Sequence, residues 1–336
     1  MKTVTPTVTL VMVLVMAAVT AAHGPEPWPL LSRQSNSSEP APLVKETRLD
    51  HVGIFVRDLD ATTGFFSKAL GFQVHSGNTF PDGARSAGIF FESGYLELLT
   101  VTRETAVGAS ALRRAEFLAA HEGAVFFALR TPSITQTAND LRQRNVATHE
   151  SSEPANALYR ILNLDENQLP VEAFFIEYPP RTRTPEQILA LALKNQPNSA
   201  CRLASVWVAV SNFDEAVRRF QELGFESGRQ FTIKALHARG VEITFGRASV
   251  LLLEAHGAGP TSEFLKQRGT AIMGVTVEVR DLNHVTSILR RNGIAEVPAR
   301  ARAWGRSLLI PASQAHGIWI AFTTRHTKAQ SPEPVR

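Results

Sequence analysis

Apolar and polar positions along residues 47–101 follow an order that predicts one strand, one helix and three further strands. An apolar run covers about 49–56 and is followed by the turn RDLD. Residues 59–69 then carry apolar side chains at helical spacing on one broad face, with an aspartate before them to cap the helix and Gly71 after them to end it. The runs FQVHS, SAGIFFES and YLELLTV come next and favour strands.

The same order of elements recurs three times along the chain. The later strand–turn–helix segments are AVFFALRTPSITQTANDLRQRNV, LASVWVAVSNFDEAVRRFQELGF and AIMGVTVEVRDLNHVTSILRRNGI, and strand-like runs follow each of them. Three of the four turns carry Asp or Asn where a helix cap is expected. Because chance does not repeat both the element order and the turn chemistry, we interpret the body of the chain as four βαβββ modules of an α+β protein.

The first module, LDHVGIFVRDLDATTGFFSKALGF with SGYLELLTV, resembles the βαβββ unit of the vicinal oxygen chelate superfamily, which includes glyoxalase, bleomycin resistance and extradiol dioxygenase proteins. It is most similar to the glyoxalase-like domains of that superfamily. The resemblance implies that two modules form one domain, whose curved mixed sheets enclose a cleft. We therefore expect one glyoxalase-like domain at 47–178, a linker helix at 179–200 and a second glyoxalase-like domain at 201–325.

The resemblance also implies candidate metal ligands at the first and last strands of paired modules. In the first domain these positions are His51, Glu97, Ala124 and Glu172. One imidazole and two carboxylates suit a divalent ion such as Zn, Ni, Mn or Fe, with Glu172 as a ligand or as the general base. Glu177 is the alternative to Glu172, because residues five apart face opposite sides of a regular strand and a shifted strand would exchange them.

A metal-free interpretation stands beside this one. A histidine that opens a strand is commonly a hydrogen-bonded structural residue, and Glu97 could pair with an arginine. Several relatives implied by the resemblance keep the fold and bind no metal. His121, shortly before Ala124, is a further candidate for the missing imidazole if the strand is shifted locally.

An apolar pocket for a small-molecule ligand is indicated by the aromatic residues near these positions, which are Phe90, Phe91, Tyr95, Phe126, Phe127, Phe174 and Phe175. We assign Tyr95, Phe91 and Phe127 to this pocket, although alternation requires half of the aromatic residues here to face the core. The amphipathic segment 102–121 lies between the two modules and could cover the cleft, with Leu112, Phe117 and Leu118 as its expected apolar anchors. Arg113 and Arg114 within it could attract an anionic substrate.

The second domain lacks these side chains. Its corresponding positions are Ser205, Gly274, Leu251 and one near Ile320 or Ala321, and none of them coordinates a metal well. We therefore interpret this domain as a structural partner or a binding lobe. The resemblance implies that two-domain extradiol dioxygenases hold their metal in the second domain, so an extradiol-type dioxygenase is disfavoured here.

Composition and charge narrow the classes of partner and location. The net charge is +4, but the basic residues are scattered, so we expect no nucleic-acid partner. Residues 1–22 are typical of a signal peptide, and their apolar stretch is short for a membrane span. We therefore expect a secreted or periplasmic protein without a stable membrane anchor. Residues 23–46 and 326–336 are rich in Pro and polar residues, which predicts a disordered linker and tail.

The sequence supports three hypotheses about function. The leading one is an exported, metal-dependent lyase or isomerase that acts on a small carbonyl or hydroxy compound in the first-domain cleft. The second is a metal-free small-molecule binding protein of the resistance type, and the third is a degenerate member with a structural role only. Either a monomer or a homodimer is expected.

Overall fold

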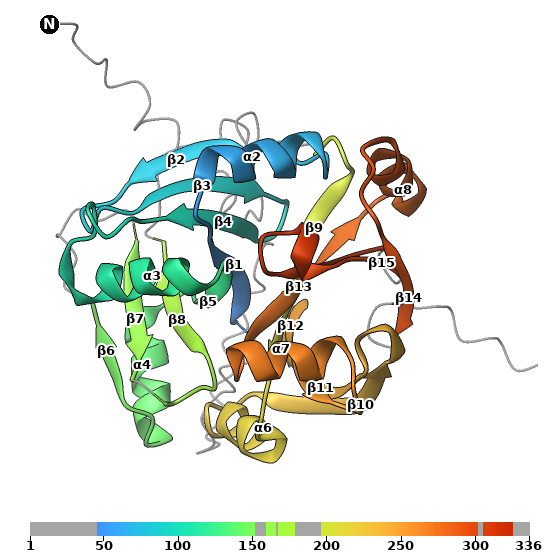
Figure 1. Cartoon of the computed structure of the whole chain (residues 1–336). Coiled ribbons are helices and arrows are strands. Elements are labelled where there is room, and N and C mark those ends of the chain that lie inside the picture. The colour runs from blue at the N-terminus through green and yellow to red at the C-terminus, as the bar shows by residue number, and fades with distance from the viewer. Residues whose placement is uncertain (1–45, 152–158, 166, 179–195, 302–304, 325–336) are drawn as a thin grey trace, which may run out of the picture.

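The computed structural model describes residues 46–151, 159–165, 167–178, 196–301 and 305–324 (Figure 1). The predicted signal peptide, the predicted tail and almost all of the predicted disordered linker lie outside the described residues. So does most of the predicted linker helix, since its residues 179–195 are not described. No helix among the described residues is long and apolar enough to cross a membrane.

Two mixed sheets of eight strands each form the body of the protein (Figure 1). The first sheet has the order β2-β3-β4-β1-β5-β8-β7-β6, and the second has the matching order β10-β11-β12-β9-β13-β16-β15-β14. In each sheet the first strands of two modules pair antiparallel at the centre, β1 with β5 and β9 with β13. This topology confirms an α+β fold of four βαβββ modules paired into two glyoxalase-like domains.

The elements have the following bounds. The strands of the first sheet are β1 (Arg48–Phe55), β2 (His75–Thr79), β3 (Arg85–Phe90), β4 (Tyr95–Thr100), β5 (Gly123–Arg130), β6 (Thr148–Glu150), β7 (Arg160–Leu164) and β8 (Glu172–Glu177). Those of the second are β9 (Ala200–Ala209), β10 (Glu226–Ile233), β11 (Ala238–Phe245), β12 (Ala248–Ala255), β13 (Ala271–Val279), β14 (Val297–Ala301), β15 (Gly305–Ile310) and β16 (Trp319–Thr324). The described α-helices are α2 (Leu59–Lys68), α3 (Gly108–Ala120), α4 (Ile134–Gln143), α6 (Phe213–Glu222), α7 (Pro260–Arg268) and α8 (Leu282–Arg291).

Side-chain caps start the helix of each module. Asp58, Asn212 and Asp281 accept hydrogen bonds from backbone N–H groups in the first turns of α2, α6 and α8, as the turn chemistry predicts. In the second module the cap is Ser133. Thr131 lies two residues too early, and its hydroxyl is 2.7 Å from that of Thr137.

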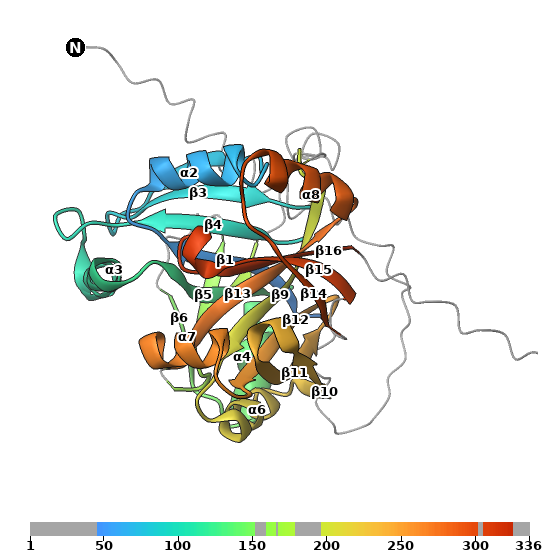
Figure 2. The same cartoon turned by 45° about the vertical axis from the view of Figure 1, so that its right-hand side comes forward.

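Each strand of the first sheet has an outer face, covered by α2 and α4, and an inner face on the opposite side. On β1, Val52 and Ile54 belong to the outer core, which also contains residues of the second sheet. The rings of Phe72 and Phe322 are 5.7 Å apart across the two sheets. Helices α2 and α8 lie side by side (Figures 1 and 2), and Asn292 Nδ2 donates to the Lys68 carbonyl at 2.7 Å. The two sheets therefore share one hydrophobic core.

Helix α3 covers part of the inner face of the first sheet. Its buried residues Ala111, Ala115 and Leu118 pack with Phe55 and Leu99 of that face. Helix α7 packs on the second sheet at the equivalent point of the chain order. The second inner face is filled by a separate apolar cluster that includes Trp207, Leu251, Phe264 and Met273.

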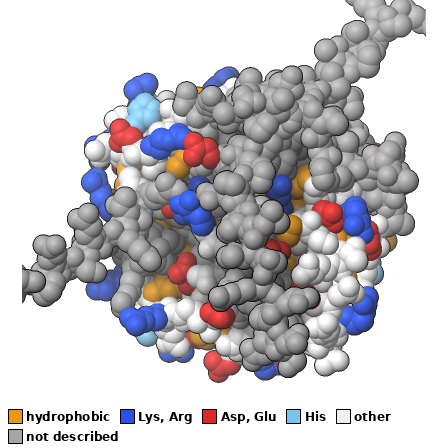
Figure 3. All heavy atoms as spheres, turned by 180° about the vertical axis from the view of Figure 1, so that it is seen from behind, with side chains coloured by type: hydrophobic (Ala, Val, Ile, Leu, Met, Phe, Trp, Pro, Cys, Tyr) orange, Lys and Arg blue, Asp and Glu red, His pale blue; other side chains and the backbone are white. Residues whose placement is uncertain are grey.

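On the face of the molecule shown in Figure 3, acidic and basic side chains are interspersed over the described part.

Candidate functional site

The inner face of the first sheet holds His51 and Glu97 at its centre. His51 lies opposite Tyr95 in the parallel pair of β1 and β4, and Gly53 lies opposite Glu97. Because side chains alternate along strands, these residues share one face. His51 and Glu97 are 4% and 5% exposed, so both ionisable groups are almost fully removed from solvent.

A β-bulge places Asp50 beside His51. Leu49 pairs with Leu129 and His51 pairs with Ala128, which leaves Asp50 as an extra residue in β1. The Asp50 carboxylate can only accept, so His51 Nδ1 donates to Asp50 Oδ1 at 2.8 Å. This bond fixes the orientation of the imidazole and directs its other nitrogen, Nε2, toward Glu97 Oε2 at 3.7 Å.

Two glycines make room for aromatic rings around Glu97. Gly53 and Gly88 both lie opposite Glu97, one on each neighbouring strand. A Cβ on Gly53 would lie 2.3 Å from the Phe126 ring, and a Cβ on Gly88 would lie 2.5 Å from the Phe90 ring. The rings therefore enclose the carboxyl group, and its burial raises the pKa of Glu97 above the usual value, while nearby His51 opposes this shift.

Asp50, His51 and Glu97 form a buried polar cluster, which we call the polar floor. Two tyrosines complete it. The Tyr95 ring stacks on the His51 ring at 4.5 Å, and the Tyr178 hydroxyl donates to Asp50 Oδ1 at 2.9 Å. Burial raises the pKa of both phenols well above the usual value, and the Asp50 charge adds to this effect. Both hydroxyls are therefore protonated at neutral pH, and the Tyr178 proton is used in the bond to Asp50.

Half-buried aromatic rings form the wall above this floor. Phe126 and Phe174 contact the His51 ring edge-on at 5.8 and 5.9 Å, and they lie 5.4 Å from each other. Two of the aromatic residues assigned to the pocket from the sequence lie elsewhere: Phe91 and Phe127 are buried in the outer core. Each is a direct neighbour in sequence of an inner-face ring, Phe90 or Phe126, so alternation sends it to the opposite face.

Glu172 lies on the same face but outside this cluster. Its position pairs with Phe126, as the position of Glu97 pairs with Gly53, so Glu172 is the counterpart of Glu97 in the second module. The Phe126 ring stands between the first-module half of the inner face, which carries His51 and Glu97, and the second-module half, which carries Glu172. The Glu172 carboxylate is 49% exposed and forms an ion pair with Arg114 of α3.

The three predicted ligands do not converge on one point. Within the described ranges, no group of three or more His, Cys, Asp or Glu side chains could hold a metal ion. An aromatic ring occupies the space over Gly53, and Glu172 pairs with an arginine. These residues do not fit a three-ligand metal site, and we derive no chemical step through a metal.

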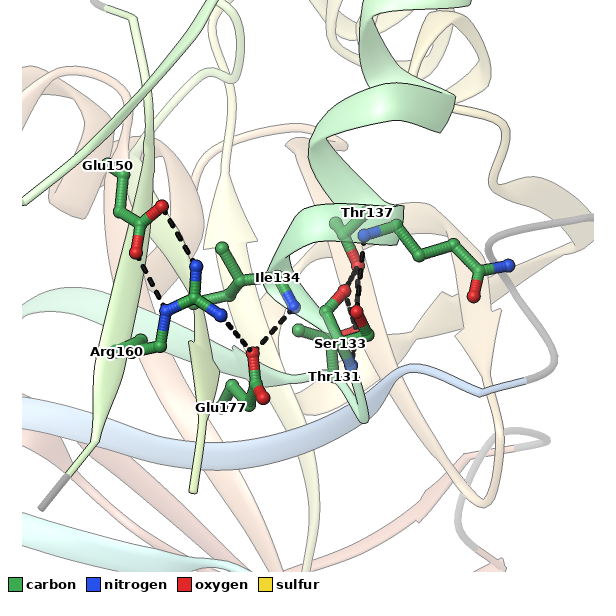
Figure 4. Close-up of polar contacts among 8 residues, drawn as sticks. Thr131, Ser133, Ile134, Thr137, Glu150, Arg160 and Glu177 are labelled. Carbon is green, nitrogen blue, oxygen red and sulfur yellow. Dashed lines mark hydrogen bonds and ion pairs between the residues drawn. The ribbon is translucent and has the colours of Figure 1, made fainter. Parts of the chain in front are cut away.

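Glu177 has a structural role that separates it from Glu172. Its Oε2 accepts from the Ile134 N–H at 2.9 Å at the start of α4, and it also accepts from Arg160 Nη1 at 3.2 Å (Figure 4). Arg160 bonds Glu150 as well, at 2.8 and 3.0 Å. Strand β8 therefore has the register that the assignment of Glu172 requires, with Glu172 on the inner face and Glu177 on the outer face.

The second-module half of the inner face opens onto a groove of about 330 Å³. Ala124 and Glu172 line it from the first sheet, and Arg268 lines it from α7 of the second domain. Of the two arginines predicted on this segment, Arg114 reaches the groove, whereas Arg113 is exposed on α3. His121 also lines the groove. Burial, with the charges of Arg268 and Arg57, lowers its pKa.

Within its described residues, the second domain carries no equivalent of this polar cluster. Ser205, at the position of His51, donates to Thr276 Oγ1 at 2.7 Å, and the Trp207 indole N–H donates to the same oxygen at 2.9 Å. Trp207 takes the place of Gly53, and its ring lies over Gly274. Its bulk fills the centre of that inner face.

Asp50 and Tyr178 were not assigned a role from the sequence. Asp50 precedes His51 directly, and regular alternation would have sent it to the outer face. Only the bulge turns the Asp50 side chain to the inner face, and no pattern in the sequence predicts the bulge. Phe126 belongs to the aromatic set that indicated a pocket, and the structure places it at the position of Gly53 in the repeat.

Comparisons with known proteins support this architecture. Residues 49–224 match a protein family described as glyoxalase-like domain. A search of curated proteins gives no match. A variant of 4-hydroxymandelate synthase from Streptomyces coelicolor has a similar structure, with a TM-score of 0.59, 12% identity, and coverage of 85% of this chain and 94% of that chain.

A hypothetical protein from Staphylococcus aureus is also similar, with a TM-score of 0.54, 12% identity, and coverage of 83% of this chain and 100% of that chain. At such identities the structures show a shared fold alone. The family match, however, spans more than half of the sequence. The chain therefore belongs to the glyoxalase-like domain family of the vicinal oxygen chelate superfamily.

Proposed function

We propose that the first glyoxalase-like domain binds a small organic molecule on its inner face, and that the protein itself provides all the contacts. The observation that carries this proposal is the position of Phe126, whose ring lies over Gly53 between the two halves of the inner face. The Phe126 ring presents an apolar surface in this place, whereas metal-dependent relatives would have side chains that bind the metal there.

The surrounding chemistry suits an organic ligand. Phe126 and Phe174 are half-buried and present ring faces or edges, which favour flat apolar groups. Beneath them, His51 Nε2 has no hydrogen-bond partner among the described residues, since Glu97 Oε2 lies 3.7 Å away. A ligand hydroxyl or amide that reached past the rings could donate to this nitrogen.

A metal-dependent lyase or isomerase is the second candidate. One observation favours it: Asp50 orients the His51 ring through Nδ1, and carboxylates hold metal-binding histidines in the same way. His51 and Glu97 would then be the residues that hold the ion, and the chemistry that such an ion would supply is polarisation of a carbonyl group. This candidate requires Phe126 to leave its position over Gly53.

A ligand screen on chelator-treated, tag-free protein tests the main proposal. We expect single-ring aromatic compounds from a fragment collection to bind, as seen by ligand-observed NMR. Phe174→Ala should weaken their binding about tenfold, since burying one ring against another group contributes on the order of 1–2 kcal/mol. Phe213→Ala, the same change on α6 of the second domain, is the matched control. No binding, or equal binding to both variants, would overturn the proposal.

Export is proposed on the composition of residues 1–22 alone. Expression of the full chain in a bacterial host, followed by N-terminal sequencing of the recovered protein, tests it. We expect a new N-terminus after Ala22. An intact N-terminus in the cytosolic fraction would contradict export in that host.

A further inference from the structure

The groove beside Glu172 is built by both domains. Arg114 and Phe117 of α3, with Val125 of β5, form one side, while Arg268 of α7 and Ile272 of β13 form the other. Its floor is the part of the inner face that carries Ala124 and Glu172, next to Phe126 of the site proposed above. The groove therefore combines an apolar surface with charges from two helices.

Arg268 is a partly buried cation that no carboxylate neutralises within the described part of the chain. Its Nη1 donates to the Glu122 carbonyl at 2.8 Å, and its guanidinium carbon lies 4.9 Å from the Phe117 ring centre and 5.7 Å from that of Phe264. A guanidinium carries five N–H donors, so several remain for another acceptor. Burial lowers its pKa, as expected for a charge that water solvates incompletely.

Among the described charged residues around the groove, Arg268 is the cation that has no acidic partner. Arg114 is paired with Glu172. The Glu122 carboxylate accepts from the Arg57 backbone N–H at 2.7 Å and lies 3.3 Å from His316 Nδ1. His121 carries a lowered pKa, so it adds little charge at neutral pH.

We propose that this groove binds the carboxylate of a small organic acid, with Arg268 as the residue that recognises it. The inference rests on the proposed function and names its ligand class: an apolar body lies against Phe117, Val125 and Val171, and the carboxylate meets the planar guanidinium fork. Arg–carboxylate pairs are commonly bidentate, and removal from water strengthens them. The second domain thereby supplies the specificity of a site whose apolar surface belongs to the first.

Carboxylate recognition is favoured over recognition of a phosphate dianion by the local charge. One unpaired guanidinium matches a single negative charge. The Glu172 carboxylate at the edge of the groove would repel a second one. Glu172 also limits the positive charge of the groove, because it pairs with Arg114.

Matched acid and amide probes test this inference by isothermal titration calorimetry. We expect phenylacetate to bind the full-length protein about tenfold more tightly than phenylacetamide, since charge-assisted hydrogen bonds exceed neutral ones. Arg268→Gln should abolish this preference. Lys266→Gln, which removes one charge from an exposed position of the same helix, should preserve it.

A variant with the opposite expected effect guards against unfolding as the explanation. Glu172→Gln frees Arg114 and should tighten phenylacetate binding, whereas Arg268→Gln should weaken it; damage to the fold would weaken both. Thermal midpoints of all variants are measured in parallel. Equal binding of acid and amide, or an Arg268→Gln variant that keeps the preference, overturns the inference and leaves the proposed function standing. Failure of both probes to bind contradicts both.

Discussion

At the scale of single residues, His51 is held by a carboxylate on one side and by rings on the others. Asp50 bonds Nδ1 at 2.8 Å, Tyr95 stacks at 4.5 Å, and Phe126 and Phe174 close the remaining sides. Strand alternation was enough to predict that His51 and Glu97 share one face. It could not reveal Asp50, because a bulge that adds one residue to β1 depends on pairing with β5.

The contact between Phe126 and Gly53 predicts a coupling between two substitutions. Gly53→Ala should lower the free energy of unfolding by about 1–3 kcal/mol, because the new methyl group would overlap the Phe126 ring. In a Phe126→Ala background the same change should be nearly neutral. Urea denaturation of the four proteins in the cycle measures this coupling. Additive effects would show that the ring does not occupy this place.

The raised pKa of Glu97 predicts a pH-dependent effect on stability. A carboxyl whose folded-state pKa exceeds its unfolded value loses stability as pH rises from the usual carboxyl pKa through the raised one. Glu97→Gln removes this penalty. Its thermal midpoint should therefore exceed that of the wild type by a few degrees at neutral pH, and the difference should shrink toward acid pH.

Thermal denaturation between acid and neutral pH measures this difference. A variant that is less stable than the wild type at every pH would instead show that His51 requires the Glu97 charge.

At the scale of elements, α3 determines how much of the inner face stays open. The amphipathic pattern of residues 102–121 predicted a helix here, and α3 spans Gly108–Ala120. Its orientation was harder to predict. Leu112, an apparent apolar anchor, is 40% exposed, whereas Ala111 and Ala115 face the sheet. Small residues let the helix approach Phe55 and Leu99 closely, and a hydrophobicity pattern gives little weight to alanine.

This orientation predicts unequal effects for two leucines of α3. Leu118 is 5% exposed and packs with Phe55, so Leu118→Ala should cost about 2–4 kcal/mol. Leu112→Ala should change stability by less than about 0.5 kcal/mol, because the side chain is exposed. Chemical denaturation compares them directly. Equal losses would mean that the helix lies on its other face.

At the scale of the whole molecule, the module repeat predicted the two sheets and their pairing, and the family match supports them. The contact between the sheets was beyond sequence patterns, because apolar residues show that a face is buried without showing its partner. Phe72 and Phe322 meet across the sheets, and His316 lies against Phe65 and Phe66 of α2. The groove lined by Arg268 exists only because of this packing.

The shared core predicts that both domains unfold together. Calorimetric and van't Hoff enthalpies should agree within error for the intact chain, although it contains two sheets. Phe322→Ala should lower the midpoint of the single transition, because the side chain is fully buried between the sheets. Two resolved transitions would show that the interface contributes little to stability.

The central claim is that the inner face of the first domain, with its interdomain groove, binds an organic ligand through protein side chains alone. Calorimetric titration of phenylacetate into tag-free protein, before and after chelator treatment and again after adding zinc or manganese, tests it most directly. The account predicts the same dissociation constant in all three states. Binding that disappears with the chelator and returns with the metal would contradict it.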